Sequence, residues 1–353
     1  MSWQDKLRQV QPYIAGEQPR IQNLIKLNTN ENPYHPGIKV KEAIQRFDAS
    51  KLSLYPRPDA DELRQALADY HHVSEQQIFI GNGSDEVLAL LFLTCFNGEA
   101  PVLFPDISYS FYPVYCDLYQ IPYQKIPLNE QFEIVKEDYY QENSGIIFPN
   151  PNAPTGLCVS LHMIEDILKH NQESIVVIDE AYVDFGGESA VSLIEQYPNL
   201  LITQTFSKFR SLAGIRLGVA IGSQEVIARL YDVKNSFNSY PIDSLAQVIG
   251  LASMQDSDYI QDNAQKIIAT REYTKKQLKK LGFEMPDSKA NFLFIKHPHY
   301  DAQTLFEKLR ERGILVRYFH QPRIEQYLRV TIGTQQQMEI FIEEMKKILE
   351  EEI

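Results

Sequence analysis

The chain has 353 residues, more than one hydrophobic core usually holds, so two domains or one large domain with an appendage are expected. A composition of 44% hydrophobic and 23% charged residues is typical of a globular protein and excludes a disordered chain. The formal charge of -13 argues against nucleic acid or an anionic membrane as a partner, because both favour a basic face.

The amino terminus and the cysteines bear on the compartment. The first residues are charged from Asp5 onward and lack an apolar core with a cleavage site, which predicts a cytoplasmic protein without a signal peptide. The longest apolar stretch, VLALLFLTCF, is too short to span a bilayer as a helix. Three cysteines without CxxC spacing, and histidines without carboxylate companions, suggest neither a disulfide framework nor a metal site.

The first confident element is a helix over residues 58–72. Its apolar residues recur at helical spacing, and Asp59 and Glu62 stand where a capping box would. Apolar or β-branched runs then alternate with helix-like segments; the runs cover residues 77–81, 101–105, 144–149, 174–180, 200–206 and 216–222. Strands without polar alternation are buried on both faces, so this order predicts an α/β fold with a mostly parallel central sheet.

The last third of the chain has a different pattern. Residues 256–282 predict one long helix leading away from the sheet, followed by strands near 291–296, 313–319 and 327–334 and by a final amphipathic helix. Together with the amino-terminal segment these form a predicted smaller α/β domain. The expected division is residues 1–45 joining the small domain, 46–256 as the large domain, and 257–353 as the interdomain helix and the rest of the small domain.

Polar motifs follow the predicted strands, where ligands bind in parallel α/β sheets. In TFSKFRSLAGIR, Lys208 is either a solvated lysine or an amine that forms a Schiff base with an aldehyde cofactor. For the second reading, Ser207 and Arg216 could anchor the anionic end of that cofactor. A lysine acting as a base needs a lowered pKa, which low solvation and Arg216 are expected to provide.

Three other strand ends fit the same cofactor. GNGSDE opens a helix whose amides face an anion, with Ser84 as the expected N-cap and Asp85 beside it. Asp179 ends a buried strand and needs a cation such as a pyridinium nitrogen, although a salt-bridged or capping aspartate is the plainer reading. Tyr182 could reach the same ring edge, and Tyr109 offers a face for stacking or simply packs in the core.

The succession NPNAPTG, DEAY and TFSK followed by LAGIR resembles the fold type I pyridoxal-phosphate enzymes of the aspartate aminotransferase superfamily over essentially the whole chain. With LNTNENPYHPG near the start, YPRPD at Tyr55 and YLRVTIGT near the end, the sequence is similar to the histidinol-phosphate aminotransferase family. The resemblance implies pyridoxal 5′-phosphate as cofactor and a large and a small domain.

The resemblance also implies residue roles. Lys208 would be the Schiff-base lysine, Asp179 the partner of the pyridine nitrogen, Tyr182 the contact of the ring oxygen and Tyr109 the stacking ring. Ser84, Asp85, Ser207 and Arg216 would surround the cofactor phosphate, and Tyr55 would reach the phosphate of a neighbouring subunit, which implies a homodimer. Ala153 stands where relatives often carry a ring-binding asparagine, so Asn152 is the candidate for that bond.

The activity implied is reversible transamination between L-histidinol phosphate and 2-oxoglutarate, giving imidazole acetol phosphate and glutamate in histidine biosynthesis. Arg317 and Arg329 are the candidate readers of the substrate anions, with Tyr13 and Asn30 as closing contacts. The alternatives are an aromatic amino-acid aminotransferase and a threonine-phosphate decarboxylase on the same scaffold. A binding module without turnover is disfavoured by the presence of both Lys208 and Asp179.

Overall fold

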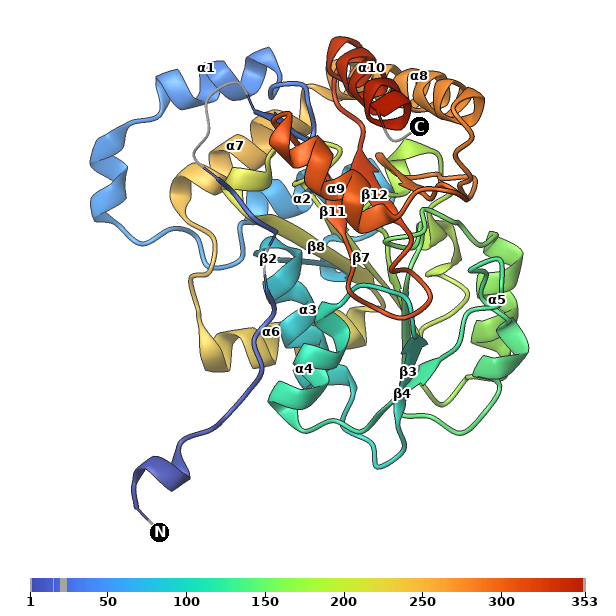
Figure 1. Ribbon diagram of the computed structural model, residues 1–353. Coiled ribbons are helices and arrows are strands. Elements are labelled where there is room, and N and C mark those ends of the chain that lie inside the picture. Colours follow the sequence, from blue (N-terminus) through green and yellow to red (C-terminus); the bar gives the residue numbers. More distant parts are fainter. Residues whose placement is uncertain (1, 15, 20–23, 352–353) are drawn as a thin grey trace.

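The computed structural model describes residues 2–14, 16–19 and 24–351. Its centre is a seven-stranded sheet in the order β2-β8-β7-β6-β5-β3-β4 (Figure 1). The strands are β2 (Ile78–Asn82), β3 (Val102–Pro105), β4 (Tyr123–Ile126), β5 (Gly145–Pro149), β6 (Val176–Asp179), β7 (Leu200–Thr205) and β8 (Leu217–Gly222). All are parallel except β8, which runs antiparallel to both β2 and β7.

Helices cover both faces of this sheet. Buried side chains of one face pack with those of α2 (Asp61–His71), α5 (Leu161–His170) and α7 (Ser244–Met254). The other face packs against α3 (Gly83–Cys95), α4 (Phe111–Tyr119) and α6 (Gln224–Phe237). Because β3, β5, β6 and β8 are buried along their whole length, the predicted unalternating apolar strands are confirmed.

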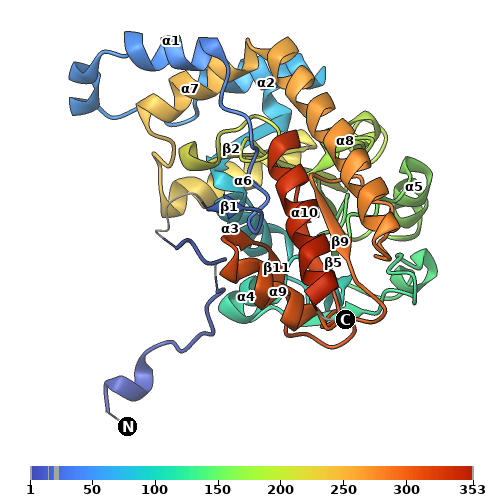
Figure 2. The ribbon, with the colours of Figure 1, turned by 45° about the horizontal axis from the view of Figure 1, so that its top comes forward.

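A second core lies beside this sheet, around a three-stranded sheet of order β11-β12-β9. Its elements are α8 (Ser257–Lys280), β9 (Phe292–Ile295), α9 (Ala302–Glu311), β10 (Ile314–Leu315), β11 (Arg317–Tyr318), β12 (Leu328–Thr331) and α10 (Gln335–Glu351). The long helix α8 and the terminal helix α10 lie side by side (Figure 2). The amino-terminal strand β1 (Ile25–Lys26) pairs in parallel with β10, so both ends of the chain contribute to this part.

The remaining regular elements are short or peripheral. Helix α1 (Ile38–Arg46) packs on α7, and residues near the amino terminus extend away past α4 (Figures 1 and 2). The 3₁₀ turns are η1 (Gln4–Lys6), η2 (Ala49–Ser53), η3 (Glu75–Gln77), η4 (Lys136–Tyr139), η5 (Val183–Phe185), η6 (Ala190–Leu193) and η7 (Ala213–Ile215).

Two predicted helix starts are wrong. The N-cap of α2 is Ala60 in a left-handed conformation, with no side-chain cap, and the Asp59 carboxylate instead lies 3.5 Å from the Lys234 amine. Helix α3 begins at Gly83 after the N-cap Asn82, which places Ser84 inside the first turn rather than at the cap. In both cases a left-handed residue turns the chain into the helix, and sequence spacing alone does not reveal this.

Two further predictions concern a membrane-spanning helix and a metal site. Within residues 2–14, 16–19 and 24–351, no helix is both long and apolar enough to cross a membrane. Within the same residues, no three His, Cys, Asp or Glu side chains are grouped in a way that could hold a metal ion.

Candidate active site

Lys208 lies in the turn after β7, and its side chain is partly buried. Its Nζ donates a hydrogen bond to the Thr29 carbonyl at 3.1 Å. Burial is the main cause that lowers the pKa of this amine to about 8, and the positive charge of Arg329 is the second. Arg216, expected to be the main cationic neighbour, contributes less than Arg329.

The main chain of Lys208 is held by the amino-terminal segment. Asn32 Nδ2 donates to the carbonyl oxygens of Lys208 at 2.9 Å and of Phe209 at 3.2 Å. Asn32 Oδ1 in turn accepts from the Tyr34 amide, which fixes the orientation of the side chain. Hydrogen bonds therefore hold the turn that carries the amine against a segment far from it in sequence.

Asp179 is the last residue of β6 and is 5% exposed. Its carboxylate accepts hydrogen bonds from the Tyr112 hydroxyl at 3.0 Å and from the Ala181 amide at 3.3 Å. Burial outweighs these bonds and raises the pKa of the carboxyl to about 6. A cationic ring nitrogen placed here would reverse that penalty, because an opposite charge favours the ionised carboxylate.

Tyr182 and Asn30 lie on the other side of the lysine. The Lys208 Nζ is 6.0 Å from the centre of the Tyr182 ring. The Tyr182 hydroxyl accepts a hydrogen bond from Asn30 Nδ2 at 2.9 Å, and burial raises its pKa. Asn30 is itself anchored by Thr331 at the end of β12, so it connects the second core to the lysine.

The predicted anion site lies at the amino-terminal end of α3. Asp85 accepts from Arg216 Nη2 at 2.8 Å and from the Tyr109 hydroxyl at 3.0 Å. A Cβ on Gly83, where φ is +79°, would lie 2.5 Å from Arg216 Nη2, so only glycine leaves room for the guanidinium. Helix amides, an arginine and a close backbone approach together suit a phosphate.

Ser207, the fourth residue predicted to bind the anion, follows β7. It is 6% exposed, and its hydroxyl accepts from the Thr205 hydroxyl at 3.0 Å. The Thr205 hydroxyl also accepts from the Ser207 amide at 3.1 Å, which holds the two residues in one tight turn. The structure brings Arg216 and Asp85 into contact, and the assignment of Ser84 and Ser207 to the same anion stays a prediction.

Asn152 is buried near the same sheet edge. Its Nδ2 donates to the Ile107 carbonyl at 3.1 Å and to Thr155 Oγ1 at 3.0 Å, while its Oδ1 has no partner among the described residues. The free atom is therefore an acceptor, whereas a ring oxygen calls for a donor. The Tyr182 hydroxyl is the better placed donor for that ring oxygen.

Arg317 and Arg329 face each other across the β11–β12 ladder. Arg329 donates to the Asn28 carbonyl at 3.1 Å and lies over the rings of Phe292 and Phe319, with its buried Nε unpartnered among the described residues. Neither arginine forms an ion pair with a carboxylate of the described residues, and burial lowers the pKa of Arg329. Two adjacent unpaired guanidinium groups make this a site for an anionic ligand.

Tyr13 and Tyr55, the remaining predicted site tyrosines, lie in different surroundings. Tyr13 stacks on Phe111 at 4.3 Å and influences the pKa of Arg329, so it belongs to the same region. Tyr55 is 83% exposed and stacks on Tyr240 at 4.8 Å. Within the described part of its own chain, Tyr55 shows no hydrogen bond or ring contact with Lys208, the anion site or the arginine pair.

Three contributors were missed from the sequence: Tyr112, Asn32 and Thr29. Tyr112 lies in the first turn of α4, whereas Tyr109 precedes that helix, so their spacing does not mark the contact between Tyr112 and Asp179. Asn32 and Thr29 act on a lysine far along the chain through contacts that no local pattern predicts.

The chain is similar to known proteins over nearly its whole length. Residues 22–345 match the family "Aminotransferase class I and II". The chain is 60% identical to histidinol-phosphate aminotransferase of Lactococcus lactis subsp. cremoris (strain SK11), covering 99% of this chain and 98% of the relative. It is 52% identical to the enzyme of the same name from Pseudomonas syringae pv. syringae (strain B728a), with 97% of each chain covered.

Solved structures share the fold. Histidinol-phosphate aminotransferase from Clostridium acetobutylicum superposes with a TM-score of 0.85 at 24% identity, covering 92% of this chain and 99% of that one. The Sinorhizobium meliloti protein of that name, in complex with pyridoxal-5′-phosphate, gives 0.83 at 20% identity, with 93% and 92% covered. The predicted fold type is confirmed, and the chain belongs to the class I and II aminotransferases, among the histidinol-phosphate aminotransferases.

Proposed function

We propose that the chain transfers the amino group of L-histidinol phosphate to 2-oxoglutarate, giving imidazole acetol phosphate and glutamate, with pyridoxal 5′-phosphate as cofactor. The substrate assignment rests on Arg317 and Arg329, which are neighbours near Lys208. Neither forms an ion pair with a carboxylate of the described residues. Relatives of 52–60% identity that carry this enzyme name support the proposal.

The cofactor fits the residues that surround Lys208. When bound, it supplies an aldehyde carbon and a ring that accepts electrons. We assign its phosphate to Ser84, Asp85, Ser207 and Arg216, its ring face to Tyr109 and its ring oxygen to Tyr182, with Asn152 alongside. Asp179 would keep the ring nitrogen protonated, and the hydrogen bond from Tyr112 would hold its carboxylate in place.

Lys208 has two tasks in this proposal. Its amine holds the aldehyde at rest, and it moves the proton of the substrate's amine-bearing carbon during transfer. Both tasks need a neutral amine, and a pKa of about 8 leaves a useful neutral fraction near pH 7 to 8. Burial and Arg329 therefore support the chemistry as well as binding.

The arginine pair would read the substrates. Histidinol phosphate carries a phosphate and 2-oxoglutarate carries two carboxylates, and a guanidinium makes paired charge-assisted bonds to either group. We propose that Arg329 serves both substrates, whereas Arg317 favours the phosphate. Tyr13 and Asn30 are the proposed closing contacts, since they lie beside Arg329 and Tyr182 respectively.

Several wider assignments belong to this proposal. The division into residues 1–45, 46–256 and 257–353 is part of the proposal; the buried side chains of α8 belong to the second core. A homodimer with Tyr55 serving the neighbouring subunit, and a cytoplasmic location, are proposed from the family resemblance. A threonine-phosphate decarboxylase from Porphyromonas gingivalis shares the fold at 23% identity, but no observation favours that reaction here.

The arginine assignment is tested with Arg317→Ala. The variant should lower kcat/KM for histidinol phosphate by roughly 10- to 100-fold, the scale of one hydrogen-bonded charge. Phenylalanine, which has no phosphate, should lose much less. Arg229→Ala, on the exposed face of α6, is the matched control and should change neither value. Retention of the wild-type preference for histidinol phosphate in Arg317→Ala would refute the phosphate assignment.

A further inference from the structure

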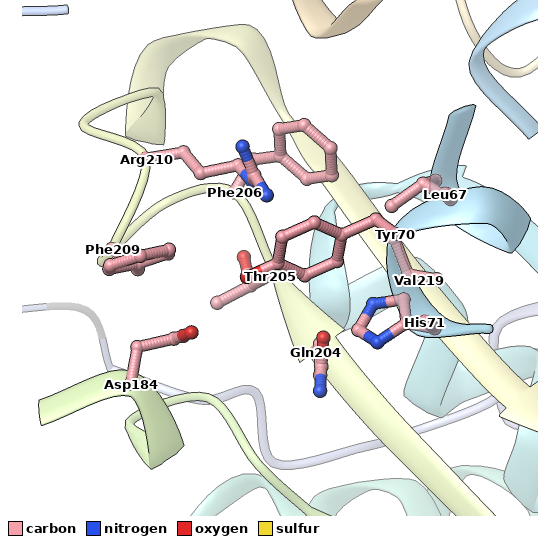
Figure 3. A pocket seen from close by; sticks show the side chains of 10 residues that line it. All are labelled: Leu67, Tyr70, His71, Asp184, Gln204, Thr205, Phe206, Phe209, Arg210 and Val219. Carbon is pink, nitrogen blue, oxygen red and sulfur yellow. The ribbon is translucent and has the colours of Figure 1, made fainter. Parts of the chain in front are cut away.

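A small cavity lies beside the turn that carries Lys208. That turn, with Arg210, forms one wall, Asp184 of η5 forms a second, and Tyr70 and His71 at the end of α2 form a third (Figure 3). Val219 of β8 also lines the cavity, which therefore touches four separate stretches of the chain. None of its lining residues has a role in the proposed transamination.

Arg210 is almost fully buried, at 6% exposure. Its guanidinium lies 5.1 Å from the Tyr70 ring centre, 5.2 Å from that of Phe206 and 5.7 Å from that of Phe209. One N–H group donates to the Ser253 carbonyl at 3.1 Å. A guanidinium has five N–H donors, so others remain for a partner in the cavity.

Asp184 is the acidic group that faces this guanidinium across the cavity (Figure 3). The two groups do not approach within ion-pair distance of one another. Burial raises the pKa of Asp184 to about 6, although the charge of Arg210 acts to lower it. Burial also lowers the pKa of Arg210. Two charges desolvated in this way need a bridging polar partner to be stable.

The cavity volume is about 20 Å³, which is enough for one water molecule and too small for an organic ligand. We propose that one ordered water bridges the Asp184 carboxylate and the Arg210 guanidinium, and that this bridge makes Arg210 a positioning residue for Lys208. The inference rests on the proposed function, because it concerns how the turn presents the amine to the cofactor.

The position of Arg210 in the turn explains how it would act. It follows Lys208 by two residues, and the Ser211 amide donates back to the Lys208 carbonyl at 3.5 Å. Asn32 fastens the same turn from the side of the amino-terminal segment. Arg210 connects the turn to α7 through its hydrogen bond to Ser253. Through the proposed water it would also connect the turn to η5. Loss of the Asn32 contacts or of the Arg210 contacts would let the amine move relative to the cofactor aldehyde.

The test separates attachment to lysine from general cofactor binding. Pyridoxal phosphate forms a bond to Lys208, whereas pyridoxamine phosphate occupies the same site without that bond. Arg210→Met should weaken pyridoxal-phosphate affinity about tenfold, the effect of losing one buried hydrogen-bonded contact, and change pyridoxamine-phosphate affinity by less than about twofold. Asp184→Asn should act in the same direction. Arg229→Met on α6 is the matched control and should bind both forms as the wild type does.

Equal losses for the two forms, or no loss for either, would overturn the positioning role. Arg210→Lys keeps the charge and guards against an Arg210→Met chain that does not fold, and the same comparison applies to it. A high-resolution crystal structure of the wild-type holoenzyme should show one water within hydrogen-bonding distance of both groups, and a direct Asp184–Arg210 contact would contradict the bridge. A wild-type protein that bound neither cofactor form would instead refute the proposed function.

Discussion

At the scale of single residues, burial shifts the pKa values of the two central groups in opposite directions. It lowers the pKa of Lys208 to about 8 and raises that of Asp179 to about 6. In both cases burial favours the uncharged form more than water does. A cofactor that brings a cationic nitrogen to Asp179 and an aldehyde to Lys208 suits both groups.

The lysine shift gives a pH prediction. The amine attacks an aldehyde only when it is neutral, so the rate at which apoenzyme takes up pyridoxal phosphate should rise with pH and level off above about 8. Stopped-flow absorbance across the range of about pH 6 to 10 measures this rate. A rate that still rises steeply at about pH 10, as the ordinary lysine pKa of about 10.4 requires, would contradict the lowered value.

Substitution of the two residues separates their roles. Lys208→Ala should still bind the cofactor through the phosphate contacts but should lose transamination. Asp179→Asn should also retain the cofactor, with kcat lowered on the order of 100-fold or more, because the ring nitrogen is no longer held protonated. Equilibrium dialysis and single-turnover kinetics measure the two properties. Wild-type turnover in either variant would remove that residue from the mechanism.

The sequence marks candidate residues where a polar side chain stands at the end of a buried strand, and their roles stay predictions. Lys208, Asp179 and Tyr182 follow buried strands, and the carboxyl edge of a parallel sheet brings such residues together. Tyr112 and Asn32 could not be found in this way, since each acts through a contact between distant segments. The atom that Asn152 leaves free depends on its neighbours Ile107 and Thr155, so the sequence could not define it either.

At the scale of elements, the phosphate site depends on how closely β8 approaches the start of α3. A Cβ on Gly218 would lie 2.5 Å from the Gly83 carbonyl carbon and 2.6 Å from the Ser84 amide nitrogen. These are backbone atoms, which cannot rotate away as a side chain would. The glycine in β8 therefore allows the anion-binding amides to sit against the sheet.

Gly218→Ala should lower the free energy of unfolding by about 1–3 kcal/mol through overpacking and should weaken cofactor binding. Gly214→Ala is the control, because nothing lies within 4 Å of a Cβ there. It should change stability by no more than about 0.5 kcal/mol. Urea denaturation and cofactor titration of both variants provide the comparison, and equal behaviour of the two would contradict the close approach.

Elements were predicted well where they are buried and poorly where they are not. Strand β4 was missed because Gln124 and Lys125 are exposed polar residues on an edge strand, so no apolar run marks it. The antiparallel direction of β8 was also missed. Residues 206–216 connect it to β7 without a crossover helix, and a parallel strand would need one.

At the scale of the whole molecule, the role proposed for Tyr55 is to serve the site of a neighbouring subunit. Its ring is 83% exposed and contacts Tyr240 instead of the lysine site of its own chain. Subunits carrying both Tyr55→Phe and Lys208→Ala should therefore form heterodimers with wild-type subunits in which the one lysine-bearing site binds cofactor more weakly. Heterodimers with Lys208→Ala alone are the control. Equal cofactor affinity in the two heterodimers would remove the shared site.

The identity of the amine substrate is the central claim, and steady-state kinetics with 2-oxoglutarate as acceptor test it most directly. Histidinol phosphate, phenylalanine and threonine phosphate are compared as substrates, while glutamate and carbon dioxide are both measured. We predict the highest kcat/KM for histidinol phosphate, by about tenfold or more over phenylalanine, with glutamate formed and no carbon dioxide released. A higher kcat/KM for phenylalanine, or carbon dioxide released from threonine phosphate, would contradict the proposed function.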